Sequence, residues 1–295
     1  MSRGLKKNSQ SQAGGVGPPF VLSASMRPSW IVIVASLIGC AGFFYPFLLP
    51  TIAQGDDNSA HAGEAPLMIA AVTAFCLLAI VIDLGSAGRG PSSKTVALLG
   101  VLVSIDAALR LAPSFLGASP IFLLIILAGS VYGPSFGFQM GALTLLVSAF
   151  LTGGLGPWLP YQMLGAGWVG MSAGWLPKPS SIRTRIALLA GFGALWGFAY
   201  GALLNLWFWP FSAPGAAADA GLYWNPGLSA AASVGRYLRF YAVTSLGYDF
   251  ARAIGNVVLT FVLGAPLLMV LERFQSKFDW RPWSVSAPEE MIIPS

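Results

Sequence analysis

Charged residues are scarce in this sequence. Asp, Glu, Lys and Arg together make up 9% of its 295 residues, whereas 56% are hydrophobic; an average globular protein is about 25% charged. None of these four residue types occurs between Arg110 and Lys178. A soluble domain would have to face water somewhere along so long a segment, whereas membrane-spanning helices joined by tight turns would not. The scarcity of charge therefore excludes a soluble globular domain and predicts an all-α polytopic membrane protein.

Residues that bind metals or carry redox chemistry are also few. The sequence has one histidine, His61 in a polar segment, and two cysteines, Cys40 and Cys76, within apolar runs. Cysteines in such surroundings behave as small hydrophobic side chains, and a lone histidine without neighbouring ligands does not form a metal site. We therefore expect no metal and no catalytic cofactor.

The motifs of the common catalytic classes are missing as well. There is no Gly-Lys-Ser/Thr phosphate loop, no His-Glu-x-x-His motif and no serine-hydrolase motif with triad partners. The carboxylates Asp83, Asp106 and Asp249 are scattered, which counts against an intramembrane enzyme acting on a lipid or isoprenoid substrate. That enzyme and a plain scaffold subunit remain alternatives to a transporter subunit, which would have to obtain its energy from partner chains.

Eight apolar segments alternate with polar or glycine- and proline-rich ones. They cover residues 30–49, 67–84, 95–111, 120–132, 136–151, 161–175, 186–209 and 240–271. If the N-terminus is cytoplasmic, most Lys and Arg residues gather on the cytoplasmic side, and the acidic segment 50–66 lies outside. This distribution follows the positive-inside rule. We therefore expect a multi-pass protein of the plasma membrane with both termini in the cytoplasm.

Two pairs of opposite charge fall within the apolar segments. Asp106 and Arg110 are four residues apart, which is the spacing of an ion pair along a helix. Asp249 and Arg252 are three residues apart and can neutralise each other. Charged residues in a membrane helix are costly and commonly mark a cavity or a partner. We expect the pair formed by Asp106 and Arg110 to be structural.

The turn between the fifth and sixth apolar segments carries an unusual set of side chains. Glycines and prolines shape it, and aromatic and amide side chains accompany them: Gly153, Gly154, Gly156, Pro157, Trp158, Pro160, Tyr161 and Gln162. A simple connection needs no such set. The predicted topology places this turn, the tryptophan-rich end 205–209 and the long segment 211–239 on the external face. We therefore expect them to converge on a small-molecule site with aromatic and amide walls.

Four segments resemble the substrate-binding (S) components of energy-coupling-factor transporters. They read GPSFGF at 133–138, SAFLTGGLGPWLPYQM at 148–163, NLWFWP at 205–210 and TSLGYD at 244–249. They look closest to the actinobacterial group related to cobalamin-type S components. The resemblance implies a non-catalytic chain with a six-helix core that captures a vitamin outside the cell. It also implies docking on a transmembrane coupling subunit that carries two ATP-binding subunits.

On this basis the chain is expected to have four parts. A disordered basic tail, 1–28, precedes a two-helix N-terminal extension, 29–94. The six-helix substrate-binding core, 95–278, is followed by a cytoplasmic tail, 279–295. The fold class is thus an S-component-like core with two extra N-terminal transmembrane helices.

Candidate site residues follow from the predicted convergence and from the resemblance. Those expected in the pocket or its lid are Trp158, Tyr161, Gln162, Asn205, Trp209, Trp224, Arg236 and Asp249. The aromatic rings would cover the apolar faces of the ligand, while the amides and Arg236 would bind its polar rim. A flat corrinoid such as cobalamin would suit this lining, and another large vitamin or precursor is the next candidate.

A second group of candidates lies on the third apolar segment. Gly100, Ser104 and Ala108 recur every four residues and line small side chains along one helical face. Such a face allows a close approach of another helix. The resemblance implies that this small-residue stripe docks on the coupling subunit, and ordinary packing within the chain is the alternative.

Overall fold

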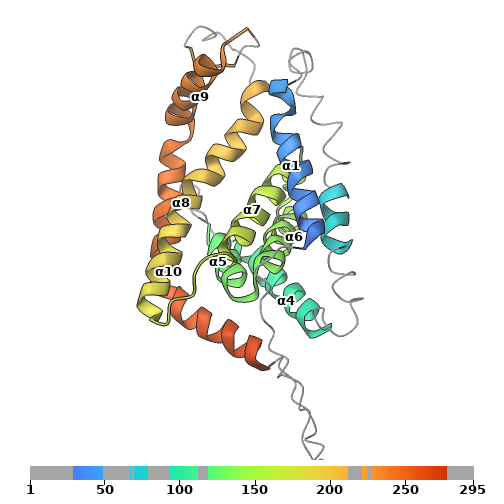
Figure 1. The fold of residues 1–295 in the computed structure, drawn as a ribbon, viewed down its shortest axis with the longest axis vertical. Coiled ribbons are helices and arrows are strands. Elements are labelled where there is room, and N and C mark those ends of the chain that lie inside the picture. The colour runs from blue at the N-terminus through green and yellow to red at the C-terminus, as the bar shows by residue number, and fades with distance from the viewer. Residues whose placement is uncertain are drawn as a thin grey trace, which may run out of the picture.

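Helices make up the fold throughout the part of the chain that the structure describes. The computed structural model describes residues 29–48, 67, 70–78, 93–111, 119–211, 221–224 and 227–277. The predicted tails, the acidic segment 50–66 and part of the predicted second span lie outside these residues. The elements are α1 (Trp30–Leu48), α4 (Ser93–Leu109), α5 (Ile121–Tyr132), α6 (Pro134–Thr152), α7 (Leu159–Ala173), α8 (Ile182–Phe208), the 3-10 helix η1 (Trp209–Phe211), α9 (Ala230–Thr244) and α10 (Leu246–Lys277) (Figure 1). The all-helical prediction is confirmed for these residues.

Helix α5 lies at the centre of the bundle. Every residue from Ile121 to Val131 is buried, and the helix carries no charged side chain. A helix that is hydrophobic on all sides must be surrounded by other elements, and α4, α6, α7, α8 and α10 all contact it. The hydroxyl of Ser130 donates to the carbonyl of Leu127 at 2.8 Å, so this buried polar group is satisfied within the helix.

Helices α6 and α7 approach each other so closely that their backbones touch. A Cβ atom at Gly137 would overlap the carbonyl group of Gly170, and a Cβ atom at Gly170 would overlap that of Gly137. Small residues at such a crossing let membrane helices pack at close range. Glycine is needed at both ends of α6 for a different reason. Gly133 and Gly153 have φ angles of 98° and 66°, which side chains disfavour, and they allow the sharp turns into and out of α6.

Helices α8 and α10 form a second tight pair. Gly193, Gly197 and Gly201 recur every four residues along α8 and face α10. A Cβ atom at Gly197 would lie 2.7 Å from the Cα atom of Ala253, and the side chain of Asn256 donates to the carbonyl of Gly193 at 2.8 Å. Within the described residues, α6, α8 and α10 are the three helices that are long and apolar enough to cross a membrane.

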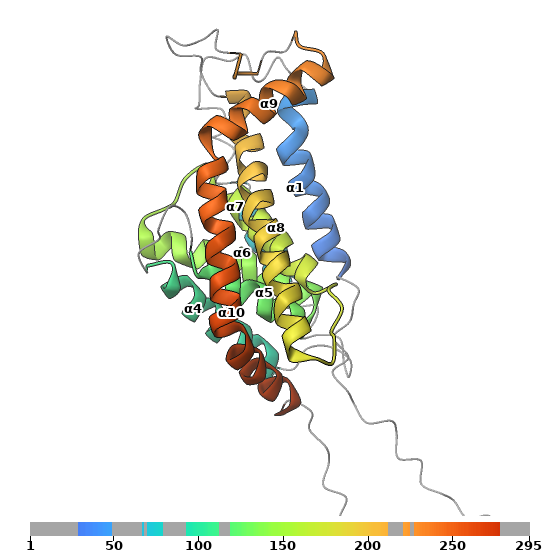
Figure 2. The same cartoon turned by 90° about the vertical axis from the view of Figure 1, so that its left-hand side faces the viewer.

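Helix α9 is a separate element that the sequence analysis did not predict. Residues 211–239 were expected to form a loop and 240–271 a continuous span, but α9 covers Ala230–Thr244 and α10 starts at Leu246. The Ser229 hydroxyl caps the start of α9 by accepting from the N–H of Ala232 at 3.3 Å. Of its residues only Phe240 is buried. This amphipathic helix therefore lies across the ends of α1, α8 and α10 instead of joining the last span (Figure 2).

Helix α1 packs directly on the core. The ring of Phe43, which is 1% exposed, lies 5.0 Å from the ring of Tyr161 and 5.6 Å from that of Trp168. The indole N–H of Trp168 donates to the hydroxyl of Ser36 at 3.0 Å. The first helix of the predicted N-terminal extension therefore contacts α7. The range predicted for a six-helix core, 95–278, holds α4, α5, α6, α7, α8 and α10 and, in addition, α9. The division of the chain into domains stays a prediction.

Candidate functional site

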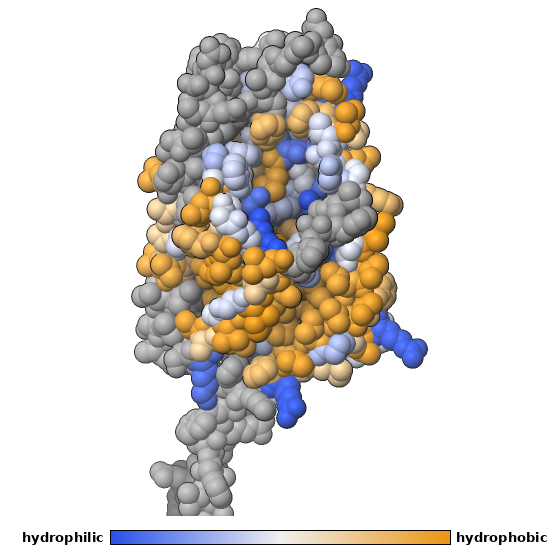
Figure 3. Space-filling model, turned by 180° about the vertical axis from the view of Figure 1, so that it is seen from behind, coloured by the Kyte–Doolittle hydropathy of each residue, from blue (hydrophilic) through white to orange (hydrophobic). Residues whose placement is uncertain are grey.

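A hollow opens on the face of the bundle that is turned away from the viewer in Figure 1. Figure 3 shows hydrophilic side chains at its floor and a largely hydrophobic surface below it. The end of α4, the turn between α6 and α7, and α10 lie on this side, with α8 behind them (Figures 1 and 2). These elements carry several charged and amide side chains with polar partners. Arg110 donates to Gln162, Arg252 pairs with Asp249, and Asn205 donates to the hydroxyl of Ser245, just before α10. We call Arg110, Gln162, Asn205, Asp249 and Arg252 the polar cluster.

Arg110 follows α4 and turns inwards to α6 and α7. Its Nη1 atom donates to the Ser148 hydroxyl at 2.8 Å, and its Nη2 atom donates to Oε1 of Gln162 at 3.4 Å. The Ser148 hydroxyl itself donates to the carbonyl of Leu145 at 3.0 Å. The Ser148 hydroxyl proton is therefore used in the bond to Leu145, and the hydroxyl oxygen accepts from Arg110. Two neutral groups on two different helices thus fix the direction of the guanidinium.

The predicted ion pair between Asp106 and Arg110 does not form. Helix α4 ends at Leu109, and the N–H of Arg110 bonds to the carbonyl of Ala107, three residues earlier, at 3.3 Å. This tighter turn moves Arg110 off the helical face on which it would meet Asp106. Asp106 is instead fully buried beside the side chain of Thr144 of α6.

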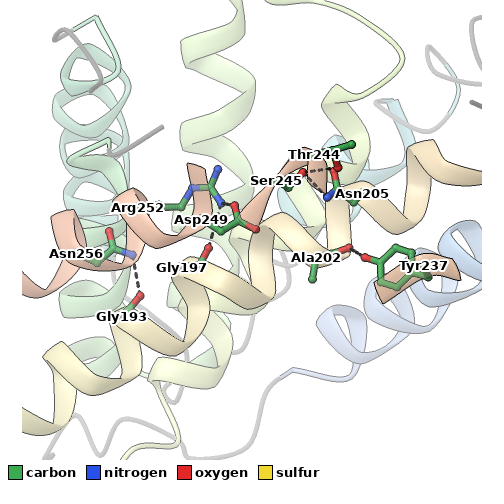
Figure 4. Close-up of polar contacts among 10 residues, drawn as sticks. All are labelled: Gly193, Gly197, Ala202, Asn205, Tyr237, Thr244, Ser245, Asp249, Arg252 and Asn256. Atoms are coloured by element: carbon green, nitrogen blue, oxygen red, sulfur yellow. Dashed lines mark hydrogen bonds and ion pairs between the residues drawn. The ribbon is translucent and has the colours of Figure 1, made fainter. Parts of the chain in front are cut away.

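Asp249 and Arg252 form the predicted ion pair on α10. The Nη1 atom of Arg252 also donates to the carbonyl of Gly197 at 3.1 Å, and its guanidinium lies 5.6 Å above the centre of the Tyr200 ring. Gly201 leaves room for the carboxylate, because a Cβ atom there would overlap both oxygens of Asp249. Figure 4 shows the pair between α10 and α8. Since α8 provides both the space and the acceptor, the ion pair ties these two helices together.

Tyr200 connects the two cationic parts of the polar cluster. Arg110 and Arg252 both lie close enough to act electrostatically on this tyrosine. Its ring packs edge-on against Phe122 of the central helix α5, with the centroids 4.9 Å apart. The ring of this tyrosine therefore packs against Phe122 of α5 and the guanidinium of Arg252.

A lid of aromatic and backbone contacts closes the bundle at the α9 end. Trp209 is 2% exposed, its indole N–H donates to the carbonyl of Leu222 at 2.8 Å, and its ring lies 5.3 Å from that of Tyr237. Arg236 donates to the carbonyl of Tyr223 at 3.2 Å, and the Tyr237 hydroxyl donates to a backbone carbonyl of α8. These contacts fasten residues 221–224 and α9 to the end of α8.

Tyr241 brings a neutral hydroxyl from α9 towards the polar cluster. Burial, together with the neighbouring Asp249 carboxyl, raises the pKa of Tyr241 to about 12. The hydroxyl therefore keeps its proton at physiological pH and can act as a hydrogen-bond donor beside Asp249.

The structure brings only part of the predicted site together. Gln162 and Asp249 belong to the polar cluster, as does Asn205, which donates to the Ser245 hydroxyl at 2.5 Å (Figure 4). Tyr161 and Trp209, which were expected to line the pocket, are 1% and 2% exposed and pack against other aromatic rings. Their rings support the wall and the lid of the site.

The other three predicted residues lie outside the polar cluster. Trp158 is 42% exposed, and its ring lies over Gly156, where a Cβ atom would overlap it. Trp224 packs against Phe47 of α1 at 5.6 Å, and Arg236 fastens the lid. A role in substrate binding stays a prediction for all eight residues.

Arg110, Tyr200 and Arg252 were not among the predicted site residues. Arg110 had been assigned to an ion pair and Arg252 to neutralising its neighbour, which left no reason to place either at a site. The glycines at 193, 197 and 201 are the signal that was available in the sequence. Their spacing indicates a helix pair in close contact, which would have directed attention to Tyr200 between them.

The predicted docking stripe faces outwards along α4. Gly100, Ser104 and Ala108 are all exposed, and nothing lies within 4 Å of a Cβ atom built at Gly100. The adjacent side chains of Val101 and Ile105 are 56% and 49% exposed. Within the part of the chain that the structure describes, no other helix therefore covers this stripe.

These features define a class of protein: a bundle of membrane helices with a polar hollow near one end and a lid across that end. The family model for the substrate-specific component of ECF transporters matches residues 94–264, which include the whole polar cluster. The chain therefore belongs to this family. Its members are non-catalytic subunits that bind a substrate and work with coupling and ATPase subunits. No curated protein and no solved structure matches the chain.

Membership of this family decides between the alternatives that the sequence left open. The chain is a transporter subunit, so the intramembrane enzyme and the plain scaffold are excluded. The resemblance to S components is confirmed at the level of the family.

Proposed function

We propose that this chain captures a vitamin or vitamin precursor at the external face of the plasma membrane. The observation that carries the proposal is a hollow with hydrophilic side chains at its floor, in a bundle whose core is largely apolar (Figure 3). The elements that carry the polar cluster lie on the same side of the bundle (Figures 1 and 2). Polar groups inside a membrane protein are costly and commonly line a substrate path. A concave site with apolar walls and a few fixed polar groups is what a small-molecule site requires.

The distribution of basic residues supports the orientation. Arg183 and Arg185 lie at the start of α8, Arg273 and Lys277 at the end of α10, and Lys178 in the connection between α7 and α8. These positions are at the end of the bundle opposite α9 (Figure 2). Basic residues gather on the cytoplasmic side of membrane proteins, so we assign that end to the cytoplasm, together with both termini. The hollow and the lid then face outwards.

Uptake would follow from this arrangement in three steps. The lid formed by α9 and residues 221–224 opens and admits the substrate, which the polar cluster binds. The small-residue stripe on α4 then docks on the coupling subunit, because it offers close approach to a partner helix. Two ATP-binding subunits supply the energy that this chain cannot supply.

Cobalamin remains the named candidate ligand from the sequence resemblance. A corrinoid needs broad apolar faces to cover its ring, and Trp158 is the predicted aromatic residue with a substantially exposed side chain, at 42%. Tyr161 and Trp209 are committed to packing inside the wall and the lid. A site with one exposed aromatic ring favours a ligand smaller than a corrinoid. Cobalamin and smaller vitamins must therefore both be tested.

Binding by the lone chain tests the proposal. The protein is purified without partner subunits, its extract is analysed by mass spectrometry and by corrinoid absorbance, and it is titrated with cobalamin and with a panel of smaller vitamins. We expect one compound to bind without turnover. A lone chain that carries nothing and binds none of these compounds would contradict the capture function.

The Trp158→Ala variant tests whether the ligand contacts the turn between α6 and α7. If the ligand packs on this ring, the substitution should weaken binding by about 1–3 kcal/mol, which is about 5–150-fold. Trp175→Ala is the matched control, because Trp175 is 45% exposed and follows the other end of α7. Equal affinities of the two variants would remove Trp158 from the site.

A further inference from the structure

The polar cluster carries an excess of positive charge. Three carboxylates fall within the described residues: Asp249 pairs with Arg252, Glu272 pairs with Arg185 at the opposite end of the bundle, and Asp106 is buried beside Thr144. Among these residues Arg110 has no carboxylate partner. The cluster thus contains two guanidinium groups and one carboxylate.

Placing a guanidinium group without a counter-charge inside a helix bundle costs free energy. Removing a charge from water costs several kcal/mol even after the protein has relaxed, and arginines near a membrane surface usually extend towards water. Arg110 does the opposite, because its side chain turns towards α6 and α7 and donates to Ser148 and Gln162. Two neutral acceptors satisfy part of its hydrogen-bonding capacity and none of its charge.

The guanidinium is also held in a fixed direction before any ligand arrives. Separate nitrogens of Arg110 contact separate helices, and the Ser148 acceptor is oriented in turn by its bond to the carbonyl of Leu145. Arginine has five N–H donors in a planar fork that matches carboxylate and phosphate oxygens. The two observed bonds leave donors for a further acceptor.

The second arginine cannot take this role. Arg252 is neutralised by Asp249, bonded to the carbonyl of Gly197 and stacked over Tyr200. These partners are all on α8 and α10, so its bonds are structural. From the unpaired charge and fixed direction of Arg110 we infer that this residue binds an acidic group of the substrate, a carboxylate or a phosphate. This inference rests on the proposed capture function and adds the chemical class of the ligand.

Matched pairs of acids and neutral analogues test the inference. The chain is reconstituted in nanodiscs of phosphatidylcholine, which has no net charge, and titrated with nicotinate and nicotinamide, biotin and biotinamide, and riboflavin 5′-phosphate and riboflavin. If no pair binds, the ligand extracted from the purified protein and its neutral derivative replace them. We expect the acid of the binding pair to bind about tenfold tighter or more than its neutral partner.

Variants of Arg110 show whether this residue is responsible. Arg110→Gln should weaken binding of the acid about 10–100-fold and leave binding of the neutral analogue unchanged. Arg110→Lys should recover part of the lost affinity, because it keeps the charge and loses the planar fork. Arg183→Gln is the control, since Arg183 is exposed at the start of α8, at the opposite end of the bundle.

The outcomes separate the two proposals. A neutral analogue that binds as tightly as its acid, or an Arg110→Gln variant that weakens both equally, overturns the acidic-ligand inference and leaves the capture function standing. A native chain that binds no compound and yields no extracted ligand overturns both. An Arg110→Gln variant that loses affinity for the acid and keeps its affinity for the neutral analogue supports the capture function and the acidic-ligand inference.

Discussion

Gly201→Ala should destabilise the contact between α8 and α10 although it adds a single methyl group. A Cβ atom at this position would overlap both carboxylate oxygens of Asp249. That side chain is only 2% exposed and is paired with Arg252. The new methyl group and the carboxylate cannot both occupy these positions, and rotation of the Asp249 side chain is the smallest change that relieves the overlap.

The size of the effect follows from what the rotation breaks. Loss of a charge-assisted hydrogen bond costs about 1.5–3 kcal/mol, and an unfavourable rotamer adds about 0.5–1.5 kcal/mol. Alanine offsets about 1 kcal/mol of this, because it is the better helix former. We therefore expect the free energy of unfolding to fall by about 1–3.5 kcal/mol.

Unfolding in mixed detergent micelles, followed by circular dichroism of the helices, measures this change. Gly191→Ala is the control on the same helix, because Gly191 is exposed and nothing lies within 4 Å of a Cβ atom there. That variant should be unchanged or more stable by up to about 1 kcal/mol. In an Asp249→Ala background the added methyl has room, so Gly201→Ala should cost nothing. Equal stability of Gly201→Ala and Gly191→Ala would refute the described contact between α8 and α10.

Two further predictions concern the other helix surfaces. Gly170→Val should lower the free energy of unfolding by about 1–3 kcal/mol or more, because its Cβ atom would overlap the Gly137 carbonyl, which is backbone and cannot rotate away; Gly235→Ala, with nothing within 4 Å, should not lower it. Ala108→Leu on the exposed face of α4 should abolish co-purification with the coupling subunit and leave ligand affinity unchanged, whereas Gly191→Leu on α8 should retain the partner. Retained co-purification of Ala108→Leu would remove the small-residue stripe from the docking surface.

The sequence predicted a helix well where its ends are determined by residues close to it in the chain. The apolar segments at 30–49, 120–132 and 136–151 correspond to α1, α5 and α6 within a few residues, because hydrophobic length and glycine or proline at the ends determine where a membrane helix begins and ends. The boundary between α9 and α10 was missed. Phe240 and the residues after it read as apolar, and only the break at Ser245, which Asn205 of α8 contacts, separates the two helices.

The site was harder to predict because its charges depend on side-chain direction. The spacing of Asp106 and Arg110 favours an ion pair, and only the tight turn at the end of α4 shows that Arg110 faces α6 and α7. The exposed fraction of a side chain also cannot be read from the sequence. Trp158 and Trp209 are both tryptophans near a predicted external turn, yet one is 42% exposed and the other 2%.

The sequence by itself determined the class of protein, because the high free energy of placing charge in a bilayer requires long uncharged apolar segments, which can be read from the sequence. It also determined the family, since the motif-bearing segments lie within the matched residues 94–264. The tertiary structure decided which charges are neutralised and which is left over. Asp249 and Arg252 neutralise each other on α10, whereas Arg110, among the described residues, donates to the neutral groups of Ser148 and Gln162. Spacing along one helix was enough to predict the pair on α10. The partners of Arg110 lie on other helices, and only the folded bundle brings those side chains together.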